Sequence, residues 1–274
     1  MPLSRYQSPS GRRFPFLQRH LLPDLFKYAA VIGALGWLIY SGVEGLGYNW
    51  QWYRVPSYLY VIENGRLTAG PLIDGLLVTL KITLISLVLA FLFGLITALL
   101  RLSHSFAARG LSRGYIEAVR NTPLLVQLFL IYFVLSPALG MGAFTSAVLA
   151  LSLFEGAYIS EIIRAGIVSV SRHQWEAAFS IGLSRWHTYR FVVLPQAVRR
   201  ILPPLTSQAV SLIKDSALVS TIAIYDLTMQ GQIIIARTYL VFELWFTIAA
   251  IYLVMTMSLS LTVYTLEKRL KIAE

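Results

Sequence analysis

The 25 residues from Leu76 to Leu100, LLVTLKITLISLVLAFLFGLITALL, contain a single charged side chain, Lys81. An α-helix rises about 1.5 Å per residue, so this stretch exceeds the roughly 30 Å hydrocarbon core of a bilayer. A soluble domain usually has about 25% charged residues, whereas the whole chain has 13%, with 57% hydrophobic residues. The sequence therefore predicts an all-α membrane protein.

Five further apolar segments are candidates for membrane spans. Val241 to Leu266 is interrupted only by Glu243, and Lys27 to Val43 is close to the minimum length for a span. Three more contain internal polar groups, over residues 115–139, 143–168 and 206–227. A core helix of a soluble protein could explain any one of these segments. Six within 274 residues indicate a multi-pass membrane protein.

The basic residues alternate across these six spans. Eighteen of the 23 lysines and arginines fall before the first span, after the second, after the fourth and after the sixth. Cytoplasmic loops carry such an excess, so both termini are predicted to be cytoplasmic. The net charge of +10 then records membrane orientation rather than binding of nucleic acid.

This orientation divides the chain into five parts. They are a cytoplasmic tail (1–26), an extra transmembrane helix (27–43), an extracytoplasmic aromatic-rich loop (44–71), a transmembrane core with the other five spans and the connection 169–204 (72–268), and a cytoplasmic C-terminal tail (269–274). The loop contains Tyr48, Trp50, Trp52 and further aromatic rings. Such rings favour the headgroup layer, so a belt at the outer interface is expected. A stacking platform for a ligand is the alternative.

The residue types that support catalysis or metal binding are scarce. The chain has no cysteine, which excludes a disulfide scaffold, a thiol enzyme and a cysteine metal site. No two of its four histidines have a metal-binding spacing. A Gly-x-x-x-x-Gly-Lys-Ser/Thr phosphate loop is absent as well. We therefore expect a chain that is not an enzyme and binds no cofactor or metal itself.

The largest cytoplasmic connection, residues 169–204, is patterned. From Gln174 to Gly182, apolar or small residues recur at the i, i+3, i+4, i+7 spacing of an amphipathic helix. Gly182 suits a left-handed helix C-terminus, and Ser184 suits the N-cap of a second helix. That second helix is expected to stop before Pro195. The pair could lie flat on anionic lipid, or it could dock into another protein.

Three motifs resemble a known family, the permease subunits of ATP-binding-cassette (ABC) importers. The spacing of Glu176-Ala177-Ala178, Gly182 and Leu194-Pro195 is similar to their EAA signature, with Val192 in place of the usual isoleucine. Residues 120–127 (RNTPLLVQ) and 156–164 (GAYISEIIR) resemble the branch that takes up polar amino acids. The likeness covers about residues 72–268, whereas the N-terminal span departs from the usual five-span core.

The resemblance implies a type I importer permease fold, with a five-helix core plus one extra N-terminal helix, in the inner membrane of a bacterium. It implies three kinds of partner: an ATPase dimer that binds ATP and Mg, an extracytoplasmic amino-acid-binding protein, and a second permease subunit. Membrane lipid is a further partner. The substrates of such an importer would be polar L-amino acids of the glutamate, glutamine or aspartate type. Coupling to the ATPase is assigned by the resemblance to Glu176, Ala177, Ala178, Gly182, Leu194 and Pro195.

Polar side chains within the spans are candidates for the substrate pathway. Glu155 lies deep in its span and could accept a substrate ammonium group, because ionisable residues in a membrane are usually functional or paired. Asn121, Thr122 and Gln127 could supply neutral donors and acceptors. These residues could instead hold two permease subunits together. Glu161 and Arg164 are three apart on one helix face, so a local ion pair is expected.

Two other classes of protein remain as alternatives. A self-sufficient secondary transporter or channel would show an internal repeat and paired broken helices near mid-membrane, and no convincing repeat relates the two halves of the chain. A purely structural membrane anchor would need neither polar residues in four spans nor the EAA spacing.

Overall fold

The computed structural model describes residues 16–45, 47–63 and 65–269. They fall into two units, divided after Trp50. In the first unit the described residues form one long helix, α1 (Phe16–Gly45), which covers the predicted span 27–43 and begins eleven residues before it. Beyond this helix, the rings of Tyr48 and Trp50 meet edge to face, with their centroids 5.2 Å apart.

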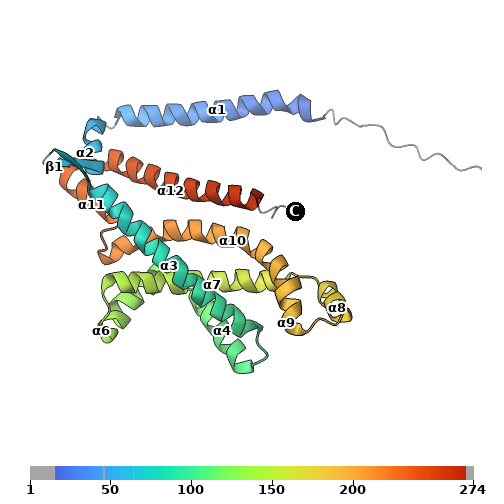
Figure 1. The fold of residues 1–274 in the computed structure, drawn as a ribbon. Coiled ribbons are helices and arrows are strands. Elements are labelled where there is room, and N and C mark those ends of the chain that lie inside the picture. Colours follow the sequence, from blue (N-terminus) through green and yellow to red (C-terminus); the bar gives the residue numbers. More distant parts are fainter. Residues whose placement is uncertain (1–15, 46, 64, 270–274) are drawn as a thin grey trace, which may run out of the picture. The chain divides into compact units, whose positions relative to one another are not determined.

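The second unit is almost entirely helical (Figure 1). Its elements in chain order are η1 (Trp52–Arg54), α2 (Pro56–Leu59), β1 (Tyr60–Glu63), β2 (Arg66–Ala69), α3 (Pro71–Leu102), α4 (Phe106–Arg120), α5 (Leu124–Phe129), the π-helical η2 (Leu130–Leu135), α6 (Ser136–Leu139), α7 (Ala143–Val168), α8 (Arg172–Ser180), α9 (Arg185–Thr188), the π-helical η3 (Tyr189–Val193), α10 (Leu194–Asp215), η4 (Ser216–Ile222), α11 (Leu227–Thr238) and α12 (Val241–Arg269). The hairpin β1–β2 is antiparallel, with Tyr60 opposite Ala69. It falls in the predicted outer loop, where the sequence analysis expected no strand.

The two central helices, α3 and α7, cross at very close range. Small residues line the crossing: a Cβ atom added at Gly94 would lie 2.5 Å from Cγ2 of Ile159 and 3.0 Å from the carbonyl oxygen of Gly156. Ser152 of α7 also donates a hydrogen bond to the carbonyl of Ser86 on α3. In membranes, helices associate mainly through such close packing of small residues.

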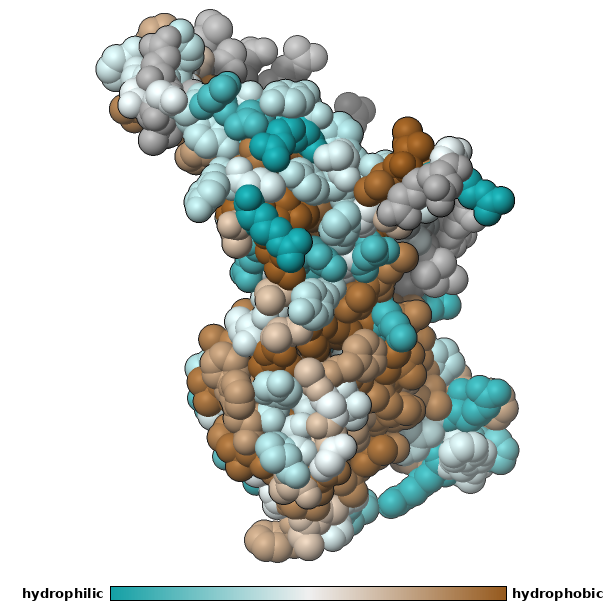
Figure 2. Space-filling view, turned by 90° about the vertical axis from the view of Figure 1, so that its left-hand side faces the viewer, coloured by the Kyte–Doolittle hydropathy of each residue, from teal (hydrophilic) through white to brown (hydrophobic). Residues whose placement is uncertain are grey.

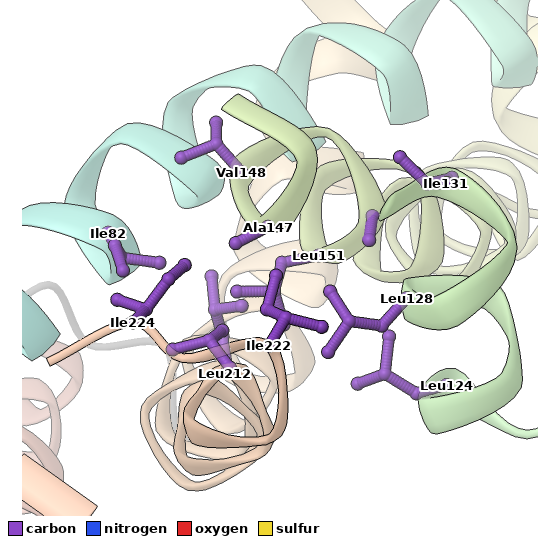
Figure 3. Close-up of a cluster of buried hydrophobic side chains, with 12 residues drawn as sticks. Ile82, Leu124, Leu128, Ile131, Ala147, Val148, Leu151, Leu212, Ile222 and Ile224 are labelled. Atoms are coloured by element: carbon purple, nitrogen blue, oxygen red, sulfur yellow. The ribbon is translucent and has the colours of Figure 1, made fainter. Parts of the chain in front are cut away.

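A cluster of buried apolar side chains, here called the apolar gate, joins α3, α5, α7, α10 and the segment after α10 (Figure 3). Ile82 comes from α3, and Leu151 lies on α7. Leu128 of α5 and Leu212 of α10 meet them from the other side, and Ile222 and Ile224 of the segment after α10 complete the cluster. The apolar gate therefore fixes α5, α7 and α10 against one another at one level.

Two of the predicted spans are bent helix pairs rather than straight helices. The segment 115–139 is divided at Pro123, where α4 and the α5–α6 stretch make an angle of 106°. The segment 206–227 belongs to a helix that begins at Leu194 and is separated from α11 by a 50° bend near Asp226. Proline lacks the backbone donor, and Asp226 caps α11 by accepting from Met229 N at 2.9 Å. A search for apolar segments of sufficient length cannot detect either change of direction.

Large hydrophobic side chains are exposed over much of the surface, as a bilayer-embedded protein requires (Figure 2). Within the described residues, α3, α7 and α12 are each long and apolar enough to cross a membrane. The two bent helix pairs raise the possible number of spans to five. Helix α1 is not among these in the described part of the chain, so the extra span at 27–43 stays a prediction.

The close α3–α7 crossing leads to a stability prediction. Gly94→Val should destabilise the protein by about 1–3 kcal/mol, because the added atoms overlap Ile159 and the crossing helix. Gly110→Val is the matched control, since a Cβ there meets nothing within 4 Å. The midpoint of thermal unfolding of the purified protein in detergent measures both variants. Equal midpoints would show that the crossing tolerates a wider separation.

Candidate functional site: a two-helix loop and an interhelical track

Helices α8 and α9 lie at the end of the second unit opposite to the β-hairpin (Figure 1). They follow α7 and lead through η3 into α10, and these two long helices are joined by a hydrogen bond between Gln208 and the buried Glu155. The predicted connection 169–204 is thus a folded extension of two membrane helices rather than a linker.

The turn between α8 and α9 forms as the local sequence predicts. Gly182 has φ +81°, a conformation that side chains with a Cβ rarely adopt. The amide of Leu183 donates to the carbonyl of Ala178 at 3.1 Å, and that of Gly182 to Phe179 at 2.9 Å, which closes the last turn of α8. Ser184 caps α9 by accepting from the amide of His187. Both predicted signals, the glycine terminus and the serine cap, are confirmed.

Aromatic contacts hold the two helices to each other. The rings of Trp175 on α8 and Tyr189 on η3 meet edge to face, with their centroids 4.8 Å apart. Ala178 is buried, and Trp175 packs against a second buried cluster that includes Val193 and Ala197. Since Ala197 is part of α10, the loop is anchored to the membrane helix by its own core.

The predicted helix end before Pro195 is wrong, because the chain stays helical there. From Tyr189 to Val193 the helix widens to a π-helix, and the amide of Leu194 donates to the carbonyl of Tyr189, five residues back. A π turn is wider than an α turn and so leaves room for the proline ring. Leu194 and Pro195 therefore join α9 to α10 as one curved helical path.

The outer face of this loop carries exposed apolar and charged groups. Ile181 is 78% exposed and Trp186 is 70% exposed. The carboxylate of Glu176 is half exposed and pairs with Arg172 at 2.9 Å and with His173 at 3.7 Å. Ala177 lies exposed beside it. Exposed tryptophan and isoleucine around a carboxylate form a surface suited to a protein partner.

A track of side chains runs between α7 and α10. Leu151 and Leu212 belong to the apolar gate at one end of this track. Glu155, four residues after Leu151 on α7, accepts a hydrogen bond from Gln208, which is four residues before Leu212 on α10. At the other end Arg200 donates to Ser169, 2.9 Å from its hydroxyl. The two helices are thus antiparallel and joined by polar contacts at two levels.

Glu155 is fully buried, and its oxygen Oε1 has no hydrogen-bond partner among the described residues. Asp215 on α10 lies close enough to interact with the same carboxyl group. A buried carboxylate with an unused acceptor is costly unless a ligand or water completes it. The site can therefore accept a hydrogen bond from a cation or amide.

Asn121, Thr122 and Gln127 come together at the α4–α5 bend. The Gln127 amide donates to the carbonyl of Val119 at 2.7 Å and to the hydroxyl of Thr122 at 2.7 Å. Asn121 donates to the carbonyl of Glu117 at 2.7 Å. These bonds satisfy carbonyls left open at the end of α4. In the described part of the chain no hydrogen bond connects them to Glu155.

The expected ion pair between Glu161 and Arg164 is confirmed, at 3.0 Å. Glu161 also pairs with Arg101 of α3 at 2.8 Å. Arg120 stacks over the ring of Tyr158, with its guanidinium carbon 5.1 Å from the ring centroid. Sequence analysis missed these two contacts because both join distant segments of the chain.

Residues 90–272 match the family described as the inner membrane component of binding-protein-dependent transport systems. The chain belongs to this family. It is therefore a permease, a transport component rather than an enzyme, and the family implies a binding protein and an ATPase as partners. The fold is that of a type I importer permease.

Individual relatives agree with this assignment. The glutamine transport permease GlnP of Escherichia coli strain K12 is 40% identical over 204 residues, which cover 73% of this chain and 93% of GlnP. The L-cystine permease TcyB of Bacillus subtilis is 42% identical over 72% of this chain and 85% of TcyB. A chain from the crystal structure of an amino acid ABC transporter with histidines is 43% identical, with a TM-score of 0.69 over 73% of this permease and 94% of that chain.

The glycine turn of the loop leads to a second prediction. Gly182→Val should impair transport while leaving the permease in the membrane, because a β-branched residue at φ +81° costs about 1–3 kcal/mol and displaces α8 from α9. Gly182→Asn is the control, since asparagine tolerates this conformation best after glycine. Substrate uptake, normalised to the amount of membrane-inserted permease, distinguishes the two variants. Full uptake by the valine variant would show that the turn is dispensable.

Proposed function

We propose that this permease imports polar L-amino acids of the glutamine, glutamate or aspartate type. It forms the translocation pathway, and a separate ATPase drives it by alternating access between inward-facing and outward-facing states. The observation that carries the coupling part of this proposal is the two-helix loop, which presents Glu176 and Trp186 and continues without a break into α10.

The substrate class is supported by the relatives. Those at about 40% identity are named as permeases for glutamine or L-cystine. The similar solved structure is named as an amino acid transporter. All three match over nearly three quarters of this chain. The comparisons lend no support to a self-sufficient secondary transporter or channel.

The coupling role goes to the loop residues. Glu176 would meet donors in a cleft of the ATPase dimer, and Ala177 and Ala178 would allow its helix to approach closely. Gly182 makes the turn, while Leu194 and Pro195 direct the path into α10. ATP and Mg would be held by the ATPase, and this chain would supply only the docking surface.

The remaining assignments concern the setting of the permease. It would lie in the bacterial inner membrane in contact with lipid, with both termini in the cytoplasm, as the distribution of its basic residues indicates. A second permease subunit, identical or related, would complete the pathway. An extracytoplasmic binding protein would deliver the amino acid.

The pathway itself would follow the track between α7 and α10. Glu155 would accept the substrate ammonium group, since it has an unused acceptor oxygen and its partner Gln208 can rotate. The apolar gate would separate this site from the outer side. Asn121, Thr122 and Gln127 would line the same route beside the α4–α5 bend.

The experiment for coupling reconstitutes the permease, its ATPase and the binding protein in liposomes. We expect uptake of L-glutamine only with ATP, and Glu176→Lys should abolish it and release the ATPase during purification. Removing one partner of a buried charge pair costs about 2–5 kcal/mol, against about 0–1 kcal/mol for an exposed pair.

Arg185→Glu is a control for charge reversal on the same loop, at a residue for which the described part of the chain records no ion pair. It should keep the ATPase bound. Uptake by the permease alone, driven by an ion gradient, would contradict the proposal. So would an ATPase that stays fully bound to the Glu176→Lys variant.

A further variant tests the pathway. Glu155→Gln keeps the shape of the side chain but removes the charge, so uptake should fall about ten- to hundredfold if a substrate cation binds there. Glu243→Gln is the control, because Glu243 is also fully buried but accepts a hydrogen bond from the amide of Gln51 at 2.6 Å, away from the track. Initial uptake rates at saturating binding protein are measured. Equal rates in both variants would exclude Glu155 from the pathway.

A further inference from the structure

The end of the track that leads into α8 contains a second site. Here α4, α7 and α10 line an open pocket of about 550 Å³, in which Arg120 and Arg200 are exposed. Its charged lining consists of Arg120 from the end of α4, Glu161 from α7 and Arg200 from α10, together with the hydroxyl of Ser169. Arg120 and Arg200 are 80 residues apart in sequence, so the fold alone brings them to one cavity.

The pocket has an excess of positive charge. Both oxygens of Glu161 are already engaged, one by Arg101 at 2.8 Å and the other by Arg164 at 3.0 Å. Arg120 interacts with Glu161 only at longer range and stacks on Tyr158. Arg200 donates to the carbonyl and hydroxyl oxygens of Ser169. Among the described residues neither Arg120 nor Arg200 is in an ion pair, so two guanidinium groups face the cavity without a carboxylate of their own.

We infer that this pocket binds the carboxylate of the transported amino acid, as an inner subsite reached after Glu155. The inference rests on the proposed function. Guanidinium groups bind carboxylates through charge-assisted, often paired hydrogen bonds, and Arg120 and Arg200 present such groups from two different helices, α4 and α10. The paired Glu161 keeps the excess charge small enough for a bound anion to be released.

The spacing supports a sequence of two subsites rather than one. Glu155 and Ile162, which lines the pocket, are seven residues apart on α7, or about 10 Å along the helix axis. An amino acid is too short to place its ammonium group at Glu155 and its carboxylate at Arg200 together. The ammonium group would therefore bind first, beside the apolar gate, and the carboxylate would bind next, closer to the loop.

The test measures binding to the purified permease–ATPase complex in nanodiscs of phosphatidylcholine, without the binding protein. The two probes are L-glutamine and L-glutamine amide, which lacks the carboxylate. The wild type should bind L-glutamine about tenfold more tightly than the amide. Arg200→Gln and Arg120→Gln should each remove most of this preference. Arg199→Gln, the adjacent exposed arginine on α10, should keep it.

Three results would overturn the inference. The first is an equal preference for L-glutamine over its amide in the wild type and all variants, and the second is no binding of either probe by the wild type. The third is displacement of L-glutamine when phosphatidylglycerol is added, which would indicate a site for a lipid phosphate. Thermal unfolding verifies that each variant is folded, and the two arginine variants serve as independent tests. ATP-driven uptake of L-glutamine is measured on the same preparations. Uptake with no arginine effect on binding rejects only this subsite, whereas wild-type complex without amino acid uptake rejects the proposed function.

Discussion

The close crossing of α3 and α7 is the constraint on which the rest of the second unit depends. At Gly94 the helices are too near for even one additional carbon atom. Ser152 and Ile159 of α7 face α3, and an adjoining second face of α7 meets α5 and α10. The track with Glu155 lies on that second face. Tight packing on one side of α7 thus provides a rigid wall against which the other two helices are positioned.

Proline residues follow π-helical turns in two of the helical paths that pack against α7. Pro137 and Pro195 each follow a π-helical segment, η2 and η3, in which an amide bonds to the carbonyl five residues back. A π turn uses an extra residue and lets the helix change direction without breaking its hydrogen bonds. The chain therefore passes both prolines, Pro137 and Pro195, while staying helical.

The sequence predicted those features that depend on neighbouring residues. Gly182 predicts the turn and Ser184 predicts the helix cap, because both features depend only on residues within four positions in sequence. It also identified Glu155 as an unusual buried charge, but its partner Gln208, 53 residues away, depends on packing between helices. The same holds for the arginines of the inner pocket. Proline was read as a helix end at Pro195, because local preference contains no information about a compensating π turn.

A continuous helical path links the loop surface to the buried site. From α9 through η3, the chain reaches Arg200, then Gln208, then Leu212 in the apolar gate without leaving helical geometry. A shift of the loop would therefore move three groups together: a cation of the inner pocket, the partner of Glu155, and a side chain that closes the gate. Packed helices move as units between discrete arrangements rather than deforming gradually. Because Glu155, Ser169 and Leu151 belong to α7 or its end, a displacement of α10 relative to α7 would change all three of these contacts together.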